Sequence, residues 1–317
     1  MKIAYFGLPL AGLLLLQDGH QLCRAVLSPV AGPGRRRLLA RLGAHRVSAG
    51  EAVSSLEIEE QLRQAQPDLI VSWYYTRLIE GSWLALAPLG GIGAHPSLLP
   101  RHRGPNPFFW SIDQGDRETG VTIHRLSDAY DTGAMLAQRR LSLDDRDAWQ
   151  LARALDRPSL QLLRDTVRQL SRGESLPEIQ QDETQATWAA EPSEDLLGVD
   201  WSWSTERILR RIRALSPVPG LALEISGVRF FVTRARPATL RPAALDPGEA
   251  VLVRRAGELE PVLCTCDGSI AIEQASWGIN EPDLDLEEGE SCSGPELARV
   301  LLRARPHMLD SVLEHTQ

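Results

Sequence analysis

The feature that most constrains the fold is a proline-rich stretch, residues 95–107, which follows two short apolar runs. The runs at 69–73 and 91–94 lack helical spacing, as expected of buried parallel strands. Proline fixes φ and removes a backbone donor, so regular structure is not expected for about a dozen residues after His95. A histidine at a strand end that opens a stiff loop lies where open α/β sheets place their ligand sites. The sequence therefore predicts a functional site at this strand end.

The residue types in and after this stretch favour proton transfer. His95 titrates near neutral pH and can accept a proton from an attacking amine or hydroxyl. Asp131 lies in a turn between two strand-like runs, and a carboxylate near an imidazole raises its basicity and fixes its orientation. Direct attack is favoured over a covalent nucleophile, because no Gly-x-Ser-x-Gly elbow and no nearby cysteine is present. On residue types alone, a core histidine and an ordinary turn aspartate remain an equal alternative.

Strand-like and helical patterns alternate through the first half of the chain. Strands are expected at 2–7, 22–27, 69–73, 91–94, 120–126 and 134–139, and helices at 9–17, 35–42 and 56–64. This alternation predicts a parallel sheet with helices on both faces. No Gly-x-Gly-x-x-Gly follows the first strand, which argues against a dinucleotide site.

The second half divides into a helical stretch, a polar linker and a second unit. Apolar residues recur at helical spacing over 148–171, and an interruption is expected at Pro158. A helix at 205–215, with Ser204 as its N-cap, precedes short strands at 221–226, 229–235, 249–254, 260–265 and 269–275, which predict a small barrel. The expected domains are 1–185 and 200–317, with the linker at 186–199.

The charge and composition of the chain limit the kinds of partner that we expect it to bind. The 317 residues carry a net charge of −8, which argues weakly against binding to nucleic acid. A basic cluster at 35–37 fits the solvated start of a helix, although it also offers contacts to the phosphates of a nucleotide sugar or of tRNA. The four cysteines are scattered without zinc spacing, so we expect reduced thiols and no metal. Because neither a signal peptide nor a membrane span is visible, we expect no membrane partner and a cytoplasmic location.

The motifs together resemble a known family. His95-Pro-Ser-Leu-Leu-Pro, the following Arg-Gly, Pro and Trp, then Thr119-Gly-Val-Thr and Asp131-Thr-Gly resemble the signature of the formyl-tetrahydrofolate-dependent formyltransferases. That family includes methionyl-tRNA formyltransferase, the amino-sugar N-formyltransferases and glycinamide ribonucleotide formyltransferase. The resemblance implies an α/β fold: an N-terminal Rossmann-like parallel sheet formyltransferase domain with a small C-terminal open β-barrel domain.

The resemblance also implies roles for residues. His95 would be the base at the attacking amine, and Asp131 the carboxylate that assists it. Formyl-tetrahydrofolate would be the co-substrate, with no metal required. The residues that would line the folate-side groove are Ser97, Leu98, Leu99 and Pro100.

One departure from the family pattern lies two residues before His95. The family has an asparagine there, whose amide helps to hold the oxyanion as the formyl carbon becomes tetrahedral, whereas this chain has Gly93. Loss of one such donor can lower turnover roughly a hundredfold to a thousandfold. Three interpretations remain open: a slow enzyme, an enzyme with a substitute donor such as Asn106, Tyr75 or a backbone amide, or a protein that binds without turnover.

The acceptor is the remaining question. The aromatic run at 73–75, followed by Arg77 and an apolar pair, is most similar to the amino-sugar formyltransferases. We therefore predict N-formyl transfer to a primary amine of a small molecule, such as an amino sugar nucleotide. The alternatives are methionyl-tRNA formyltransferase, and a catalytically impaired folate-binding protein because of Gly93. A hydrolase that releases formate is also compatible with His95 and Asp131.

Overall fold

The computed structural model describes residues 1–29, 32–49, 54–225, 227–239, 245–278, 287–304 and 313–314. The chain forms two compact units. The first comprises Met1–Pro107, Glu118–Ser142 and Ala152–Ala190, and the second comprises Phe108–Arg117, Leu143–Leu151 and Glu191–Gln317. The contiguous domain boundaries expected from the sequence, 1–185 and 200–317, remain a prediction.

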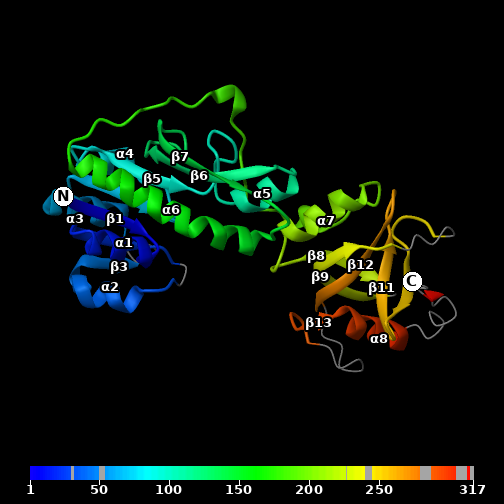
Figure 1. Ribbon diagram of the computed structural model, residues 1–317. Coiled ribbons are helices and arrows are strands. Elements are labelled where there is room, and N and C mark those ends of the chain that lie inside the picture. Colours follow the sequence, from blue (N-terminus) through cyan, green and yellow to red (C-terminus); the bar gives the residue numbers. More distant parts are fainter. Residues whose placement is uncertain are drawn as a thin grey trace. The chain divides into compact units, whose positions relative to one another are not determined.

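The first unit is built on a mixed sheet in the order β3-β2-β1-β4-β5-β6-β7 (Figure 1). Its strands are β1 (Lys2–Gly7), β2 (Gln21–Leu27), β3 (Val47–Ala49), β4 (Leu69–Trp73), β5 (Gly91–His95), β6 (Glu118–Arg125) and β7 (Met135–Ser142). The strands from β3 to β5 pair in parallel, whereas β5–β6 and β6–β7 are antiparallel. The predicted Rossmann-like sheet is confirmed, and two antiparallel strands extend its parallel part at one edge.

Helices cover both faces of this sheet. The helices in the first half of the chain are α1 (Pro9–Gln17), α2 (Arg35–Leu42), α3 (Ser55–Ala65), α4 (Gly81–Leu84), α5 (Pro107–Asp113) and α6 (Ala148–Ser171). On one face, α3 and α4 contribute Ile58 and Trp83 to a buried cluster with Phe6. On the opposite face lies α6, where Trp73 Nε1 donates to Ser159 Oγ at 2.9 Å. Figure 1 shows α6 running along the sheet.

The prediction that the helix over 148–171 is interrupted at Pro158 is wrong. Helix α6 continues through that residue for its full 24 residues. A proline inside a helix removes one backbone hydrogen bond and crowds the carbonyl four residues earlier. The apolar stripe of α6 compensates for this cost, because Leu151, Leu155 and Leu163 are fully buried on either side of the proline.

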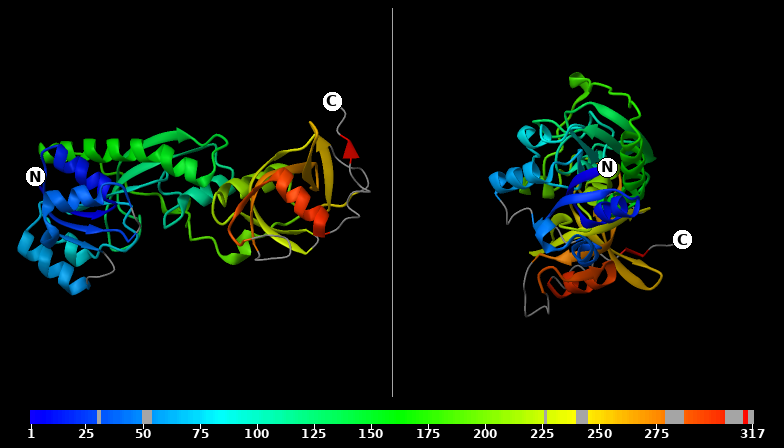
Figure 2. Two further views of the ribbon diagram at one scale, coloured as in Figure 1. Left: turned by 90° about the horizontal axis from the view of Figure 1, so that it is seen from below. Right: turned by 90° about the vertical axis from the view of Figure 1, so that its left-hand side faces the viewer.

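The second unit is built on a sheet in the order β14-β10-β11-β12-β9-β8, with β13 paired to β12. Its elements are α7 (Thr205–Ala214), β8 (Leu221–Ile225), β9 (Val228–Pro237), β10 (Ala250–Arg255), β11 (Glu258–Cys264), β12 (Ser269–Trp277), β13 (Ser291–Ser293), α8 (Gly294–Ala304) and β14 (Leu313–Glu314). Figure 2 shows α8 lying on this sheet, where it packs against β11 and β12.

The N-cap predicted for α7 is confirmed. Ser204 caps this helix, since its Oγ accepts from the N–H of Arg207 at 3.2 Å. The small C-terminal β domain expected from the sequence is confirmed. Its strands pair antiparallel, except for β10 and β14, which are parallel.

None of the helices in the described ranges combines the length and the apolar character needed to cross a membrane. The longest, α6, carries charged side chains such as Arg153, Arg164 and Arg168 along its length. These observations do not test the cytoplasmic location expected from the sequence, which remains a prediction.

Candidate active site

His95 closes β5 where the sheet changes from parallel to antiparallel pairing. Only 6% of His95 is exposed. In the β5–β6 register, His95 lies opposite Thr122, and Gly93 lies opposite His124. Because side chains alternate along a strand, these four residues share one face of the sheet. The antiparallel pairing therefore brings a second histidine to the same face as His95.

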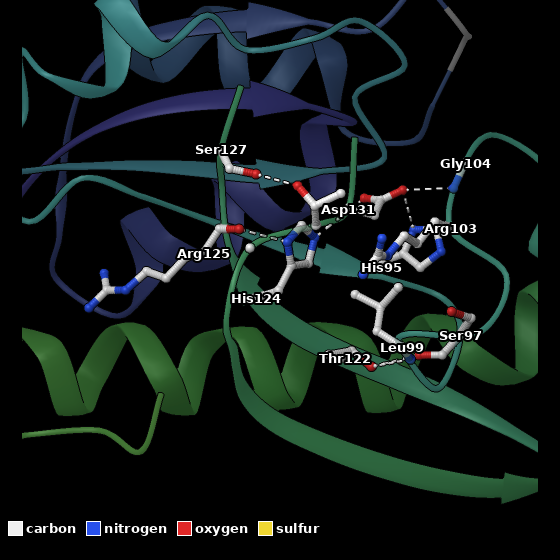
Figure 3. Close-up of polar contacts among 12 residues, drawn as sticks. His95, Ser97, Leu99, Arg103, Gly104, Thr122, His124, Arg125, Ser127 and Asp131 are labelled. Carbon is white, nitrogen blue, oxygen red and sulfur yellow. Dashed lines mark hydrogen bonds and ion pairs between the residues drawn. The ribbon is translucent and has the colours of Figure 1, made fainter. Parts of the chain in front are cut away.

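The loop after His95 is held against β6 and β7 by side-chain hydrogen bonds. Thr122 Oγ1 donates to the carbonyl of Ser97 at 2.8 Å and accepts from the N–H of Leu99 at 3.1 Å (Figure 3). Gln138 Nε2 donates to the carbonyl of Leu99 at 2.8 Å. These bonds satisfy the backbone of a loop whose prolines exclude a regular ladder, so the loop has one defined path.

The four residues predicted to line the folate-side groove open this loop. Ser97 and Leu99 are buried, whereas Leu98 and Pro100 are partly exposed. Leu98 lies over β6 at Gly120, where an added Cβ would be 2.6 Å from Leu98 Cδ2. Partly exposed apolar side chains on a fixed loop suit contact with a planar ligand. The folate-binding role of these residues remains a prediction.

Asp131 lies in the β6–β7 turn. Its φ of +58° falls in the left-handed region, which aspartate tolerates better than most residues. Gly133 follows because a Cβ at that position would lie 1.9 Å from the carbonyl oxygen of Arg125. Gln181 Nε2 secures the turn by donating to the carbonyls of Asp131 at 2.7 Å and Gly133 at 2.8 Å. The turn thereby presents the carboxylate of Asp131 to His95 (Figure 3).

The structure brings the two predicted catalytic residues together. His95 Nδ1 lies 3.4 Å from Asp131 Oδ2, which also accepts from the N–H of Gly104 at 2.9 Å. At its other nitrogen, His95 Nε2 donates to the carbonyl of His102 at 2.7 Å. Burial lowers the pKa of His95 below 6.5, although Asp131 and the carbonyl of His102 oppose this shift. At neutral pH His95 is therefore an uncharged base.

His124 is a second imidazole at Asp131 that the sequence alone did not identify. His124 Nε2 lies 3.4 Å from Asp131 Oδ1, and Nδ1 lies 2.8 Å from the carbonyl of Arg125. Figure 3 shows the carboxylate between the rings of His95 and His124. Burial alone would raise the pKa of Asp131, but the two histidines and the N–H of Gly104 outweigh it and hold that pKa below its usual range. Asp131 is therefore ionised at neutral pH.

Gly93 leaves room for this second imidazole. An added Cβ at residue 93 would lie 3.2 Å from His124 Nε2 and 2.9 Å from Leu126 Cδ2. Of these two neighbouring side chains, only that of His124 is polar. Of the substitute donors that the sequence left open, Asn106 lies in a loop whose backbone pairs with the segment at 187–189, and Tyr75 packs against the buried cluster beneath α3 and α4. Their role as donors stays a prediction.

Two exposed aromatic rings flank Asp131. Tyr130 is 43% exposed and Trp188 is 55% exposed, and their ring centroids are 6.4 Å apart. Trp188 belongs to a segment that pairs with the loop after His95, and its ring lies 3.0 Å from where a Cβ on Gly104 would be. Neighbouring exposed rings of this size usually mark a binding surface.

The arrangement is suited to moving protons. One ionised carboxylate lies between two imidazoles, and each ring also faces a backbone carbonyl. Such a cluster can accept a proton from an attacking nucleophile and hold the resulting charge. Among the described residues, no group of three or more His, Cys, Asp or Glu side chains is placed to hold a metal ion.

Comparison with known proteins gives consistent matches in sequence and in fold. The sequence matches the family model described as formyl transferase over residues 40–165, and the model described as formyl transferase, C-terminal domain, over residues 193–281. Methionyl-tRNA formyltransferase of Anaeromyxobacter dehalogenans (strain 2CP-C) is 34% identical over 286 residues, which are 86% of this chain and 90% of that protein.

Two solved structures show the same fold at lower identity. HypX from Aquifex aeolicus, in complex with tetrahydrofolic acid, is 20% identical with a TM-score of 0.65 over 99% of this chain. This chain spans about half of HypX, 48% of its length. The N-formyltransferase from Helicobacter canadensis, in complex with folinic acid and dTDP-3-aminofucose, is 14% identical with a TM-score of 0.62 and covers 86% of this chain and 98% of its own.

Proposed function

This chain belongs to the formyltransferase family, and from that premise we propose that it transfers a formyl group from formyl-tetrahydrofolate to a primary amine of a small molecule, such as an amino sugar nucleotide. The observation that carries the proposal is the contact between His95 Nδ1 and Asp131 Oδ2 at 3.4 Å. These two side chains come from the two motifs that resemble the family signature. Their contact places an uncharged base beside an ionised carboxylate, as amine acylation requires.

The proposed reaction forms one C–N bond and breaks another. The acceptor nitrogen attacks the formyl carbon, and His95 takes the proton that the nitrogen loses. Asp131 stabilises the imidazolium, because its carboxylate already faces the ring. The proton then passes to the folate nitrogen that leaves. No covalent enzyme intermediate is needed, since both substrates meet in one site and proximity supplies much of the rate.

The loop after His95 supports the folate side of this proposal. Thr122 and Gln138 fix its path, so the partly exposed Leu98 and Pro100 are held ready for a planar ring. Preorganised apolar contacts of this kind lower the entropy cost of binding. The structural relatives that were crystallised with folates share this fold. We therefore assign the folate-side groove to Ser97, Leu98, Leu99 and Pro100.

Two observations favour a small acceptor. The net charge of −8 gives no general attraction for a polyanion such as tRNA. The exposed pair of Tyr130 and Trp188, next to Asp131, offers aromatic faces that can stack on a sugar or a base. An amine attached to such a group would approach His95 from the side of these rings.

Methionyl-tRNA is the second candidate acceptor. It is favoured by the 34% identity to a methionyl-tRNA formyltransferase across 90% of that protein. The exposed arginines at the start of α2, Arg35 to Arg37, are available for phosphate contacts. Formylation of charged tRNA whose binding weakens steeply with salt would establish this candidate, because phosphate contacts release counterions.

The test is a direct assay of transfer. The purified protein is incubated with formyl-tetrahydrofolate and a panel of amines that includes amino-sugar nucleotides and charged methionyl-tRNA, and formyl adducts are detected by mass. We expect an adduct with a small amine that is lost in His95→Ala. His45→Ala is the matched control, since this exposed histidine lies in the 3-10 turn after α2. Folate binding without any adduct, or formate release alone, would overturn the proposal.

A further inference from the structure

We propose that Thr187 is a positioning residue, which sets the tautomer of His95 by holding the carbonyl of His102 against its Nε2. The proton that the attacking amine loses then goes to Nδ1 of His95. The proposal rests on the proposed function, because it names the nitrogen of the same base that takes part in the transfer. Three features of the structure support it: the two peptide groups on either side of His102, the left-handed conformation of that residue, and the two acceptors that face the ring of His95.

Thr187 accepts hydrogen bonds from two consecutive backbone N–H groups of the loop after β5. Its hydroxyl oxygen Oγ1 accepts from the N–H of His102 at 2.8 Å, and its carbonyl accepts from the N–H of Arg103 at 2.9 Å. The next contacts between the two segments join backbone to backbone, since Ala189 donates to the carbonyl of Arg103 at 2.6 Å and accepts from Asn106 at 2.9 Å. The N–H of His102 depends instead on a side chain, so a substitution at residue 187 can remove its partner and keep the backbone contacts.

Each of these two N–H groups belongs to a planar trans peptide group, in which the carbonyl points in the opposite direction. In the peptide group that supplies the N–H of His102, the carbonyl accepts from the hydroxyl of Ser97 at 2.7 Å. In the peptide group that supplies the N–H of Arg103, the carbonyl is that of His102 and accepts from His95 Nε2 at 2.7 Å. By holding both N–H groups on one side of the loop, Thr187 directs a carbonyl to His95 on the other side.

His102 has a left-handed backbone, with a φ of +58°, which residues other than glycine adopt uncommonly. Such a conformation persists only where its surroundings hold it, and Thr187 binds the N–H groups on both sides of this residue. Because only 2% of His102 is exposed, its N–H would lack a partner without Oγ1 of Thr187. Two residues further along, the N–H of Gly104 donates to Asp131 Oδ2 at 2.9 Å. The same short run therefore presents the carbonyl to His95 and holds the carboxylate that faces its ring.

The ring of His95 lies between two acceptors, and an uncharged imidazole has one N–H to donate. The carbonyl of His102 lies 2.7 Å from Nε2, whereas the carboxylate of Asp131 lies 3.4 Å from Nδ1. The shorter distance is that of a good hydrogen bond and the longer one is not, so the proton stays on Nε2 and the lone pair on Nδ1. When Nδ1 takes the proton of the amine, the new charge forms beside the carboxylate that stabilises it.

The first measurement needs no turnover. Ring nitrogen resonances of the whole protein are recorded by NMR at about pH 8, where His95 is uncharged, and His95→Ala assigns them. We expect the proton of His95 on Nε2 in the wild type. In Thr187→Val, which removes Oγ1 and keeps the shape, the ratio of the tautomers should shift toward Nδ1–H about twofold to tenfold, as the loss of one hydrogen bond implies. A proton on Nδ1 in the wild type, or an unshifted ratio in the folded variant, would overturn the proposal.

The second measurement uses the transfer reaction. Thr187→Val should lower kcat about tenfold with KM for both substrates little changed, since a displacement of about 1 Å near the reacting atoms can cost a hundredfold. Thr187→Ser keeps the hydroxyl and should recover most of this loss. Thr184→Val is the matched control, because this exposed threonine of the same segment donates its hydroxyl only to Asp182, at 2.7 Å, among the described contacts. Equal kcat in Thr187→Val and Thr184→Val, with both variants folded by thermal unfolding, would leave Thr187 a structural residue and overturn the proposal.

A pair of substitutions at residue 102 tests the backbone conformation itself. Both His102→Gly and His102→Val remove the imidazole and keep the backbone carbonyl. Glycine adopts a left-handed conformation readily, whereas a β-branched residue does so only under strain. His102→Val should therefore shift the tautomers of His95 toward Nδ1–H further than His102→Gly does, and it should lose more of kcat. Equal tautomer ratios in the two variants would overturn the proposal, because the conformation of residue 102 would then not control the ring.

The failures of the two proposals are distinguishable. If the wild type transfers formyl groups but Thr187→Val keeps both the tautomer ratio and the kcat of the wild type, the role of Thr187 is refuted and the function stands. If the wild type forms no adduct, the proposed function is refuted. In that case the NMR comparison of the wild type with Thr187→Val alone decides whether Thr187 sets the tautomer of His95.

Discussion

Gln181 donates its side-chain amide to the backbone carbonyl of Asp131 at 2.7 Å, from a position 50 residues further along the chain. The same Nε2 donates to Gly133, and Oε1 accepts from Arg103 Nε at 3.0 Å. A single buried amide therefore joins the turn that carries the carboxylate to the loop that follows the histidine. The geometry of the two proposed catalytic residues depends on this connection.

Replacing Gln181 by Ala should lower both stability and turnover. The substitution leaves two carbonyls and one guanidinium nitrogen without their partner, which costs about 1–3 kcal/mol of unfolding free energy. Because the turn loosens, kcat should fall more than KM rises. Gln185→Ala is the control, since that exposed amide binds only Asp182 among the described contacts, and its unfolding free energy should change by less than about 0.5 kcal/mol. Equal kcat in both variants would contradict the role of Gln181.

The activity should persist below neutral pH. His95 must be uncharged to act as a base, and burial lowers its pKa below 6.5. The rate of transfer should therefore stay level as pH falls from 8 to 6.5 and decline only at lower pH. Asp131 opposes this lowering, so Asp131→Asn should move the acid limb further down while reducing kcat by about a hundredfold or more. A pH–rate profile of kcat/KM measures both effects. An acid limb above pH 6.5 in the wild type would contradict the assignment of the base.

Removing the ring of Trp188 should weaken binding of the amine without slowing the transfer step itself. We expect Trp188→Ala to raise KM for the amine about twofold to tenfold with little change in kcat, because a stacked ring contributes roughly 0.5–1.5 kcal/mol to binding. Trp149→Ala is the matched control, since Trp149 is exposed to a similar extent, 58% against 55%, at the start of α6. Steady-state kinetics with a fixed saturating folate donor separate the two constants. An unchanged KM would place the acceptor elsewhere.

The second unit contains a buried ion cluster whose loss should be costly. Asp113 is 4% exposed and binds Arg211 Nε at 2.6 Å and Arg207 Nη2 at 2.9 Å. Burial alone would raise the pKa of Asp113, but the two arginines hold it below its usual value. Asp113→Ala would leave a buried guanidinium without a counter-charge, at a cost of about 3–5 kcal/mol.

Chemical unfolding measures this loss, with Glu206→Ala as the comparison. Glu206 is 79% exposed by its side chain and pairs with Arg210 one helical turn away, so its removal should cost less than about 1 kcal/mol. Acid should weaken the Asp113 cluster as well. Its stabilisation is present above the unfolded pKa of aspartate, near 4, and is lost as the pH falls through the lower folded value.

Much of the fold and part of the site could be predicted from short stretches of sequence. Apolar runs without helical spacing marked β1, β4 and β5, and the N-cap at Ser204 marked the start of α7. These features depend on residues within a few positions of one another. The helix break predicted at Pro158 was wrong, because the prediction considered only the local effect of a proline on the backbone. The leucines buried on both sides of Pro158 stabilise α6 as a continuous helix.

The sequence by itself determined the alternation of strands and helices, the stiff loop after His95 and the placement of Asp131 in a turn, because each of these follows from local backbone preferences. Only the tertiary structure decided that His124 faces Gly93 and meets Asp131. That contact depends on the register of two antiparallel strands, and a shift of one residue would have turned His124 to the opposite face. Gln181 likewise reaches the turn only through the folded path of the chain.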